Sequence, residues 1–200
     1  MKILHLDSSV TGANSVSRPL TVATVARLKE LNPGAEVTYR DLVNDPLPHS
    51  TAAARTPSAI GPDATAEQKL EVKLGETLLD ELFAADVVVI GAPMYNFGIS
   101  SQLKSWIDYL AVPGKTFSYS AEGPKGLLGG RRIILVSTRG GQYGPGSPYE
   151  AGDFQEKYLK FAFGFLGVTN IEVVRAEGIG RPDVRESAIA GAKQQIAELK

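Results

Sequence analysis

The sequence predicts an α/β protein built as a doubly wound sheet of five parallel strands, with helices on both faces. Short apolar runs alternate with longer segments of helical period, which is the pattern of βαβ units. The 200 residues give room for one such domain, and no repeat or linker divides the chain. Right-handed crossovers then favour the strand order 2-1-3-4-5 for a single domain over residues 1–200.

The first half of the chain supplies two strands and two helices. We expect strands over residues 2–6 and 36–40 and helices over 18–31 and 65–83. Asn32, Pro33 and Gly34 end the first helix, and Thr65 suits the start of the second. A polar, proline-containing excursion over residues 44–63 separates the second strand from the second helix, and the sequence does not explain it.

The second half begins with the clearest strand of the chain. Residues 86–91 are nearly all apolar, as in a central parallel strand that is covered on both faces. A loop over 92–100, a short helix to about residue 110 and a stretch interrupted by Gly and Pro to residue 130 follow. The remaining elements are expected to be strands over 132–136 and 170–176, a helix over 153–166 and a C-terminal helix from about residue 183.

The composition excludes several classes of function. The net charge of −1 offers no electrostatic footprint for nucleic acid or an anionic membrane. The absence of cysteine removes disulfides, thiolate nucleophiles, Cys-ligated zinc and iron–sulfur clusters. A His-rich metal site or a catalytic triad would have to rest on His5 or His49, and neither has a suggestive context. The start of the chain has no secretory pattern and no apolar run of spanning length, so we expect a soluble cytoplasmic protein without a metal.

Three loops fall at the carboxyl ends of the first, third and fourth strands, where ligands of doubly wound sheets bind. The first, residues 8–17, presents many hydroxyls and amides just before a helix, where free N–H groups favour an anion. It contains no lysine, so it suits a monophosphate better than a triphosphate with magnesium. The alternative is a helix cap in a polar turn, which needs only one such residue.

The second and third loops have the residue types that hold a flat heterocycle. Residues 93–98 combine aromatics with Asn96, and the alternative is that Tyr95 and Phe97 only anchor the loop in the core. In the third loop, Gly140 and Gly141 let the backbone approach a ligand, and the alternative is a plain left-handed turn. An arginine at the position of Arg139 is more often a structural partner than a ligand. No dinucleotide fingerprint or P-loop is present, so a nicotinamide would be a transient substrate.

Five strings of this sequence together resemble one known family over essentially the whole chain. The strings are LDSS with the following SVS, APMYNFGISSQLKSWID, TFSYSAEGPKGLL, STRGG and FLGVTNIEVVRAEGI. They look like the FMN-dependent NADH-azoreductases, also described as FMN-dependent NADH:quinone oxidoreductases. The resemblance implies a flavodoxin-like homodimer with one FMN per subunit, which reduces quinones and azo compounds with NADH or NADPH in a two-electron ping-pong cycle.

The resemblance also implies roles for individual residues, none of them catalytic, because N5 of the flavin does the chemistry. The implied FMN-binding residues are Ser9, Ser15, Val16, Ser17, Pro93, Met94, Tyr95, Asn96, Phe97, Thr138, Arg139, Gly140, Gly141 and Tyr143. Tyr143 stands where family members can carry a histidine, which bears on the choice of acceptor. Tyr119 and Phe165 match aromatics that cover the flavin face and shape a substrate pocket at the dimer interface.

Three rival functions share this topology. A carrier flavodoxin would exchange single electrons with protein partners and needs no substrate pocket. A receiver-type signalling domain needs an aspartate at the end of the third strand, where Ala92 and Pro93 stand. A flavin-binding repressor or adaptor would bind flavin without turnover.

Overall fold

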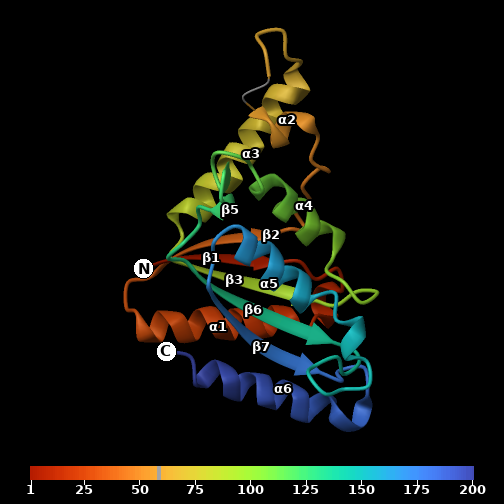
Figure 1. Ribbon diagram of the computed structural model, residues 1–200. Helices are drawn as coiled ribbons and strands as arrows, with labels where there is room; N and C mark the ends of the chain where they lie inside the picture. The colour runs from red at the N-terminus through yellow and green to blue at the C-terminus, as the bar shows by residue number, and fades with distance from the viewer. Residues whose placement is uncertain (58–59) are drawn as a thin grey trace.

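A five-stranded parallel sheet forms the centre of the computed structural model, which describes residues 1–57 and 60–200 (Figure 1). Its strands are β1 Lys2–Asp7, β2 Glu36–Asp41, β3 Val87–Pro93, β6 Arg132–Arg139 and β7 Asn170–Glu177. They are hydrogen-bonded in the order β2-β1-β3-β6-β7 and every neighbouring pair is parallel. The doubly wound order expected from the sequence is therefore observed.

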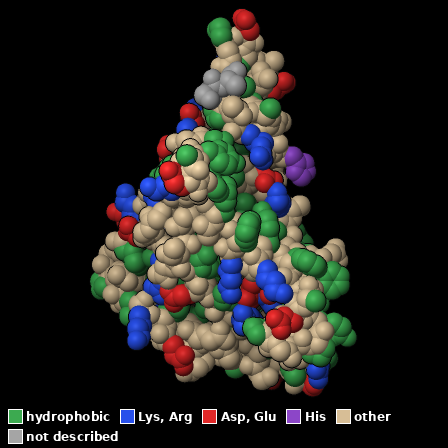
Figure 2. Space-filling view, in the orientation of Figure 1, with side chains coloured by type: hydrophobic (Ala, Val, Ile, Leu, Met, Phe, Trp, Pro, Cys, Tyr) green, Lys and Arg blue, Asp and Glu red, His purple; other side chains and the backbone are tan. Residues whose placement is uncertain are grey.

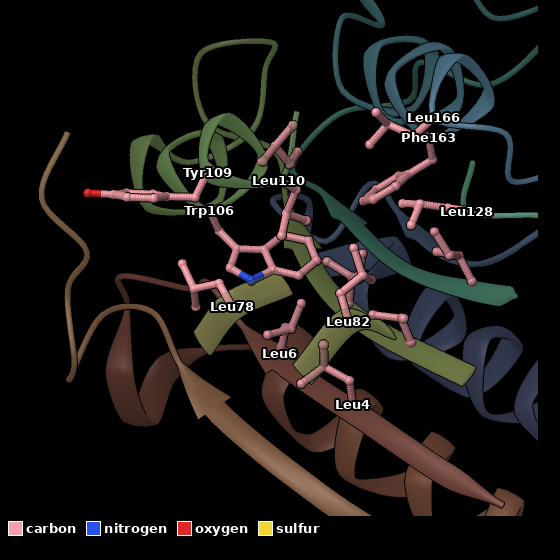
Figure 3. Close-up of a cluster of buried hydrophobic side chains, with 14 of the residues drawn as sticks. Leu4, Leu6, Leu78, Leu82, Trp106, Tyr109, Leu110, Leu128, Phe163 and Leu166 are labelled. Atoms are coloured by element: carbon pink, nitrogen blue, oxygen red, sulfur yellow. The ribbon is translucent and has the colours of Figure 1, made fainter. Parts of the chain in front are cut away.

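Helices cover both faces of the sheet and enclose a separate hydrophobic core on each (Figure 1). One face carries α1 Ser17–Leu31 and α6 Pro182–Ala197, and the other carries α3 Ala66–Ala84, α4 Ser101–Leu110 and α5 Glu156–Phe165. Successive side chains of a strand point to opposite faces, so Val88 and Ile90 enter the second core while Val89 enters the first. In the second core, Figure 3 shows the Trp106 indole among leucines of the sheet and of α3.

Two strand ends extend beyond the expected bounds. The fourth strand, expected to end at residue 136, continues as β6 to Arg139, because Ser137, Thr138 and Arg139 pair with β7. The third strand likewise continues to Pro93. The beginnings of the second and third loops are therefore held rigidly in the sheet.

A short antiparallel hairpin and a short helix lie where no regular structure was expected. The hairpin consists of β4 Phe117–Ser120 and β5 Gly123–Gly126, and the helix α2 is Ala52–Arg55 within the excursion over 44–63. Residues 58 and 59 of that excursion lie outside the described residues. Thr65 and Gln68 form a reciprocal capping box at the start of α3, which confirms the expected helix start. Within the described residues, no helix is long and apolar enough to cross a membrane.

Candidate active site

A cleft of ≈ 520 Å³, counting the space open to solvent at its mouth, lies at the carboxyl ends of β1, β3 and β6. All three loops singled out from the sequence contribute to it. Its lining residues are Ser9, Thr11, Asn14, Val16, Pro93, Met94, Tyr95, Thr138, Gly140, Ile179, Gly180 and Arg185. The last three follow β7, and sequence reasoning missed them because the end of that strand has no distinctive composition.

The hydroxyls of the first loop are held in a network at one end of the cleft. Ser9 Oγ lies 3.0 Å from Thr11 Oγ1 and 3.2 Å from the Tyr95 hydroxyl, which also accepts a hydrogen bond from the Val10 N–H at 3.1 Å. Tyr95 thus joins the first loop to the second. Tyr95 is therefore not only an apolar anchor of its loop, because its hydroxyl makes polar contacts with Ser9 and Val10.

The start of α1 faces this loop with an incomplete cap. Val16, the residue that precedes the helix, has no side chain that could accept a hydrogen bond from its first turn. Ser15 Oγ accepts from the Arg18 N–H at 3.2 Å and lies 3.2 Å from Ser17 Oγ. Ser15 therefore does fill the capping role considered above, while Ser17, which is also buried, lies beside the helix terminus.

Arg18, which sequence reasoning did not single out, fastens this loop to the neighbouring strand. Its guanidinium donates to both carboxylate oxygens of Asp41, at 2.5 and 2.9 Å, and to the Ser9 carbonyl at 3.1 Å. The hydrogen bonds from Arg18 lower the pKa of Asp41 to about 2. The positive charge of Arg18 is therefore matched by a fixed carboxylate.

A buried carboxylate lies directly below the first loop. Asp7 accepts hydrogen bonds from the Tyr39 hydroxyl at 3.1 Å and from Thr21 Oγ1 at 2.9 Å. Burial, together with the negative charge of Asp7, raises the pKa of Tyr39 to about 12. The phenol thus remains a hydrogen-bond donor at neutral pH and helps to satisfy Asp7.

The second loop turns through two residues in the left-handed region, Asn96 with φ 47° and Phe97 with φ 72°. Paired hydrogen bonds of 2.9 and 3.0 Å between Tyr95 and Gly98 close the turn. Such conformations are unfavourable for residues other than Gly and concentrate at functional sites. Within the described part of the chain, the N–H groups of Asn96 and Phe97 donate to no protein acceptor. Phe97 is 53% exposed, so the alternative that it is a core anchor is wrong.

The third loop presents backbone to the cleft. A Cβ added to Gly140 would meet no atom within 4 Å, whereas one on Gly141 would lie 3.0 Å from the Tyr143 ring. Neither glycine has a positive φ, so the alternative of a plain left-handed turn is wrong for both. Thr138 and Gly140 line the cleft, and Gly141 stands behind them against Tyr143.

Arg139 requires a correction, because its side chain does not face the cleft. It is completely buried and forms ion pairs with Asp153 at 3.0 Å, Glu156 at 2.5 Å and Glu177 at 3.0 Å. Its Nε also donates to Gln155 Oε1 at 2.9 Å. Of the two roles considered for Arg139, the structural one is observed for its side chain, since a buried guanidinium needs carboxylate partners.

Tyr143 belongs to an aromatic cluster at the rim of the site. Its ring lies 6.1 Å from that of Phe97, edge to face, and 6.3 Å from that of Tyr149. Its N–H donates to Glu177 Oε1 at 2.8 Å, which ties the loop to the Arg139 network. Hydrophobic side chains are exposed at this edge of the molecule, on the right in Figure 2. The cluster offers a flat ligand an aromatic border.

Tyr119 and Phe165 lie far from the cleft of their own chain. Both rings pack against Phe117, at 5.4 and 4.9 Å, and Tyr119 is 72% exposed. The hairpin that carries Tyr119 contacts α5 where the backbones of Gly126 and Gly167 meet, just before β7 begins. It is therefore at the amino edge of the sheet, opposite the cleft (Figure 1).

Comparisons with known proteins agree on one family. The family model described as "Flavodoxin-like fold" matches residues 1–199. The FMN-dependent NADH:quinone oxidoreductase of Rhizobium meliloti is 52% identical over 99% of this chain and 96% of its own length. An azoreductase structure from Bacillus anthracis superposes with a TM-score of 0.90 at 34% identity, over 99% of this chain and 97% of that one.

A second Bacillus anthracis structure, an FMN-dependent NADH-azoreductase in complex with FMN, has a TM-score of 0.85 at 27% identity, over 98% of this chain and 97% of that one. The fold and the full-length sequence similarity point the same way. This chain belongs to the flavodoxin-like fold family and, within it, to the FMN-dependent NADH:quinone oxidoreductases.

Proposed function

We propose that this protein is an FMN-dependent oxidoreductase that uses NADH or NADPH to reduce quinones and azo compounds. One observation carries the proposal: hydroxyls line the cleft beside an incompletely capped helix start, and a left-handed turn directly follows its lining residue Tyr95. Among the described residues, the two N–H groups of that turn donate to no protein acceptor. The first feature suits a phosphate and the second suits the polar edge of a flat heterocycle. FMN carries both groups.

The residues present fit FMN end by end. Ser9, Ser15 and Ser17 supply neutral donors at the phosphate end, beside the free N–H groups of α1. Met94 and Tyr95 border the other end from one loop and Gly140 from the other, with open space where a side chain would stand. Further FMN contacts are assigned to Val16, Pro93, Asn96, Phe97, Thr138, Gly141 and Tyr143 and to the backbone of Arg139.

FMN, when bound, supplies the two-electron chemistry, and the protein supplies orientation and a defined environment. The rigid ends of β3 and β6 position the second and third loops on both sides of the cleft, because Met94 N–H donates to the Thr138 carbonyl at 2.8 Å. No side chain is assigned a catalytic role, and protons for the products come from water. Donor and acceptor would occupy one pocket in turn, so double-reciprocal plots at varied quinone should be parallel. Intersecting lines with a demonstrable ternary complex would contradict this scheme.

We further propose a homodimer in which the partner completes the pocket. Tyr119 and Phe165 lie at the opposite end of the sheet from the cleft of their own chain, so an aromatic cover from this hairpin has to come from a second copy. The expected mass in solution is about 43 kDa, twice the 21.3 kDa of the chain. A variant made monomeric by interface charges should keep much of its FMN but lose most quinone turnover. A monomer that is flavin-loaded and fully active would refute the shared site.

The test of the proposed function is the spectrum and turnover of the purified protein. A visible flavin band that NADH bleaches reversibly without oxygen, with steady NADH-dependent reduction of a small quinone, is the expected result. A flavin band without turnover would instead indicate a carrier or an adaptor. Replacing Ser15 and Ser17 together by Ala should weaken FMN binding by about 1–3 kcal/mol, because a charged acceptor loses its donors. Ser187→Ala on the exposed surface of α6 is the matched control.

A further inference from the structure

We infer that Arg185 is the cation that recognises the cofactor phosphate and makes the cleft selective for a phosphorylated flavin over riboflavin. The inference rests on the proposed function, since it concerns FMN in the same cleft. It assigns a binding role to a residue of α6, far in sequence from the first loop.

The first loop by itself brings no uncompensated positive charge to the phosphate end. Arg18 is the cation nearest in sequence, but its guanidinium is bound by both oxygens of Asp41 and approaches Asp7 to 3.8 Å. A phosphate monoester carries about −1.5 to −2 charges at neutral pH. Hydroxyls and backbone N–H groups can donate hydrogen bonds to its oxygens, but as neutral groups they leave most of that charge unmatched.

Arg185 is the cation among the residues that line the cleft. It stands in the first turn of α6, and its Nη1 donates to the Ile179 carbonyl at 2.8 Å. Within residues 1–57 and 60–200, no carboxylate lies within ion-pair distance of it. Asn14 and Val16 of the first loop line the same cleft, so Arg185 borders the loop that holds the phosphate. Its charge is thus free to pair with an anion there.

A second hollow adjoins the cleft and supplies an internal control. Asn14, Val16 and Arg185 line both spaces, whereas Lys193 lines only the second hollow, two turns further along α6. Lys193 also has no carboxylate partner among the described residues. The two residues therefore have the same charge, lie on the same helix and are both exposed, but only Arg185 lines the cleft. An anion in the cleft depends on Arg185, and an anion in the second hollow depends on both.

The experiment titrates the full-length chain, stripped of flavin, with FMN and with riboflavin, following the quenching of flavin fluorescence. Arg185→Gln should raise the Kd for FMN about 10- to 100-fold, as expected for a lost hydrogen bond to a charged group, and leave the Kd for riboflavin unchanged. Arg185→Lys should recover part of the loss, because it keeps the charge. Lys193→Gln should bind both flavins as the wild type does. The FMN affinity of the wild type should also fall more steeply with salt than that of Arg185→Gln.

The alternatives give different patterns. Equal weakening of FMN and riboflavin by Arg185→Gln would show a purely structural role and overturn the inference. Equal effects of Arg185→Gln and Lys193→Gln would place the anion in the second hollow and overturn it as well. If Arg185→Gln binds FMN in preference to riboflavin as strongly as the wild type does, the inference is overturned while the proposed function stands. A wild type that binds neither flavin would overturn the proposed function together with it.

Discussion

Replacing Arg139 by Leu tests whether its buried guanidinium holds the third loop and the last two strands together. Arg139 is 0% exposed and pairs with Asp153, Glu156 and Glu177 at 2.5–3.0 Å. Removing one partner of a buried ion pair costs about 3–5 kcal/mol, because the remaining charges stay buried without compensation. For a chain of this size that corresponds to a fall in Tm of about 6–20 °C.

The assay is thermal and urea unfolding of the variant and the wild type, each with and without FMN. Arg181→Leu is the control, because it removes an ion pair of similar length with Asp183 in which both side chains are more than half exposed. We expect no measurable change for this control. Arg139→Lys should be intermediate, since it keeps the charge but loses the hydrogen bonds to Ser137 and Gln155.

The pH dependence gives the same test an independent readout. Burial disfavours the ionised form of Glu156, but the hydrogen bond from Arg175 and the charge of Arg139 outweigh it, so the pKa of Glu156 is lowered. A lowered pKa contributes stability above the unfolded value of 4.5, and this contribution is lost as the pH falls through the folded value. Without Arg139 the pKa rises, and the stability gap to the wild type should narrow on acidification. A variant as stable as Arg181→Leu, with an unchanged gap across pH, would refute the reasoning.

Three further predictions concern single positions. The pKa of Asp41 is lowered to about 2 from an ordinary 3.8, so its carboxylate stabilises the folded state above pH 3.8. This stabilisation is lost as the pH falls towards the folded pKa. Asp41→Asn should therefore make the fall of Tm below about pH 4 less steep. An unchanged acid limb of the Tm profile would exclude this. At φ 47°, Asn96→Val should cost about 1–2 kcal/mol in urea unfolding and Asn96→Gly should cost nothing, so equal stabilities would contradict the turn. The methyl group added by Gly126→Ala would collide with the backbone of Leu166 and Gly167 and displace the hairpin that is proposed to cover the partner's pocket. Quinone turnover should therefore fall while FMN affinity stays unchanged. Loss of FMN with the dimer intact would argue against this role of the hairpin.

The strands and the three loops were predictable because local pattern determines them. A run such as residues 87–90 is apolar on both faces only when both faces are covered, and parallel strands place their carboxyl ends at one edge of the sheet. The sequence reading therefore found most of the cleft without any contact information. The predicted fourth strand ended three residues before the end of β6. The polar Ser137 and Arg139 can be buried in that strand only because Gln155 and Glu177, which are distant in sequence, bind them.

The features that were missed depend on contacts between distant residues. Arg18 and Asp41 pair across 23 positions, and no periodicity marks them. The segment 123–126 has no strand character in its sequence and becomes β5 by pairing with β4, with Gly126 packed against Gly167. In the sequence, nothing distinguishes Arg185 from other charged residues of a predicted helix. Only the fold brings it beside Asn14 and Val16.

The hairpin with Tyr119 and the cleft stand at opposite edges of the same sheet, which has a genetic consequence in a symmetric dimer. Each site would combine the loops of one copy with the hairpin of the other copy. In any one copy, a substitution in the loops would therefore impair one site, and a substitution in the hairpin would impair the other. A chain with Ser15 and Ser17 replaced and a chain with Gly126 replaced would each have low quinone turnover alone when FMN is limiting. Co-expressed, they would form mixed dimers in which one site draws both of its parts from undamaged segments. Random pairing makes half the dimers mixed, so about a quarter of the wild-type activity should return by complementation between two defective alleles.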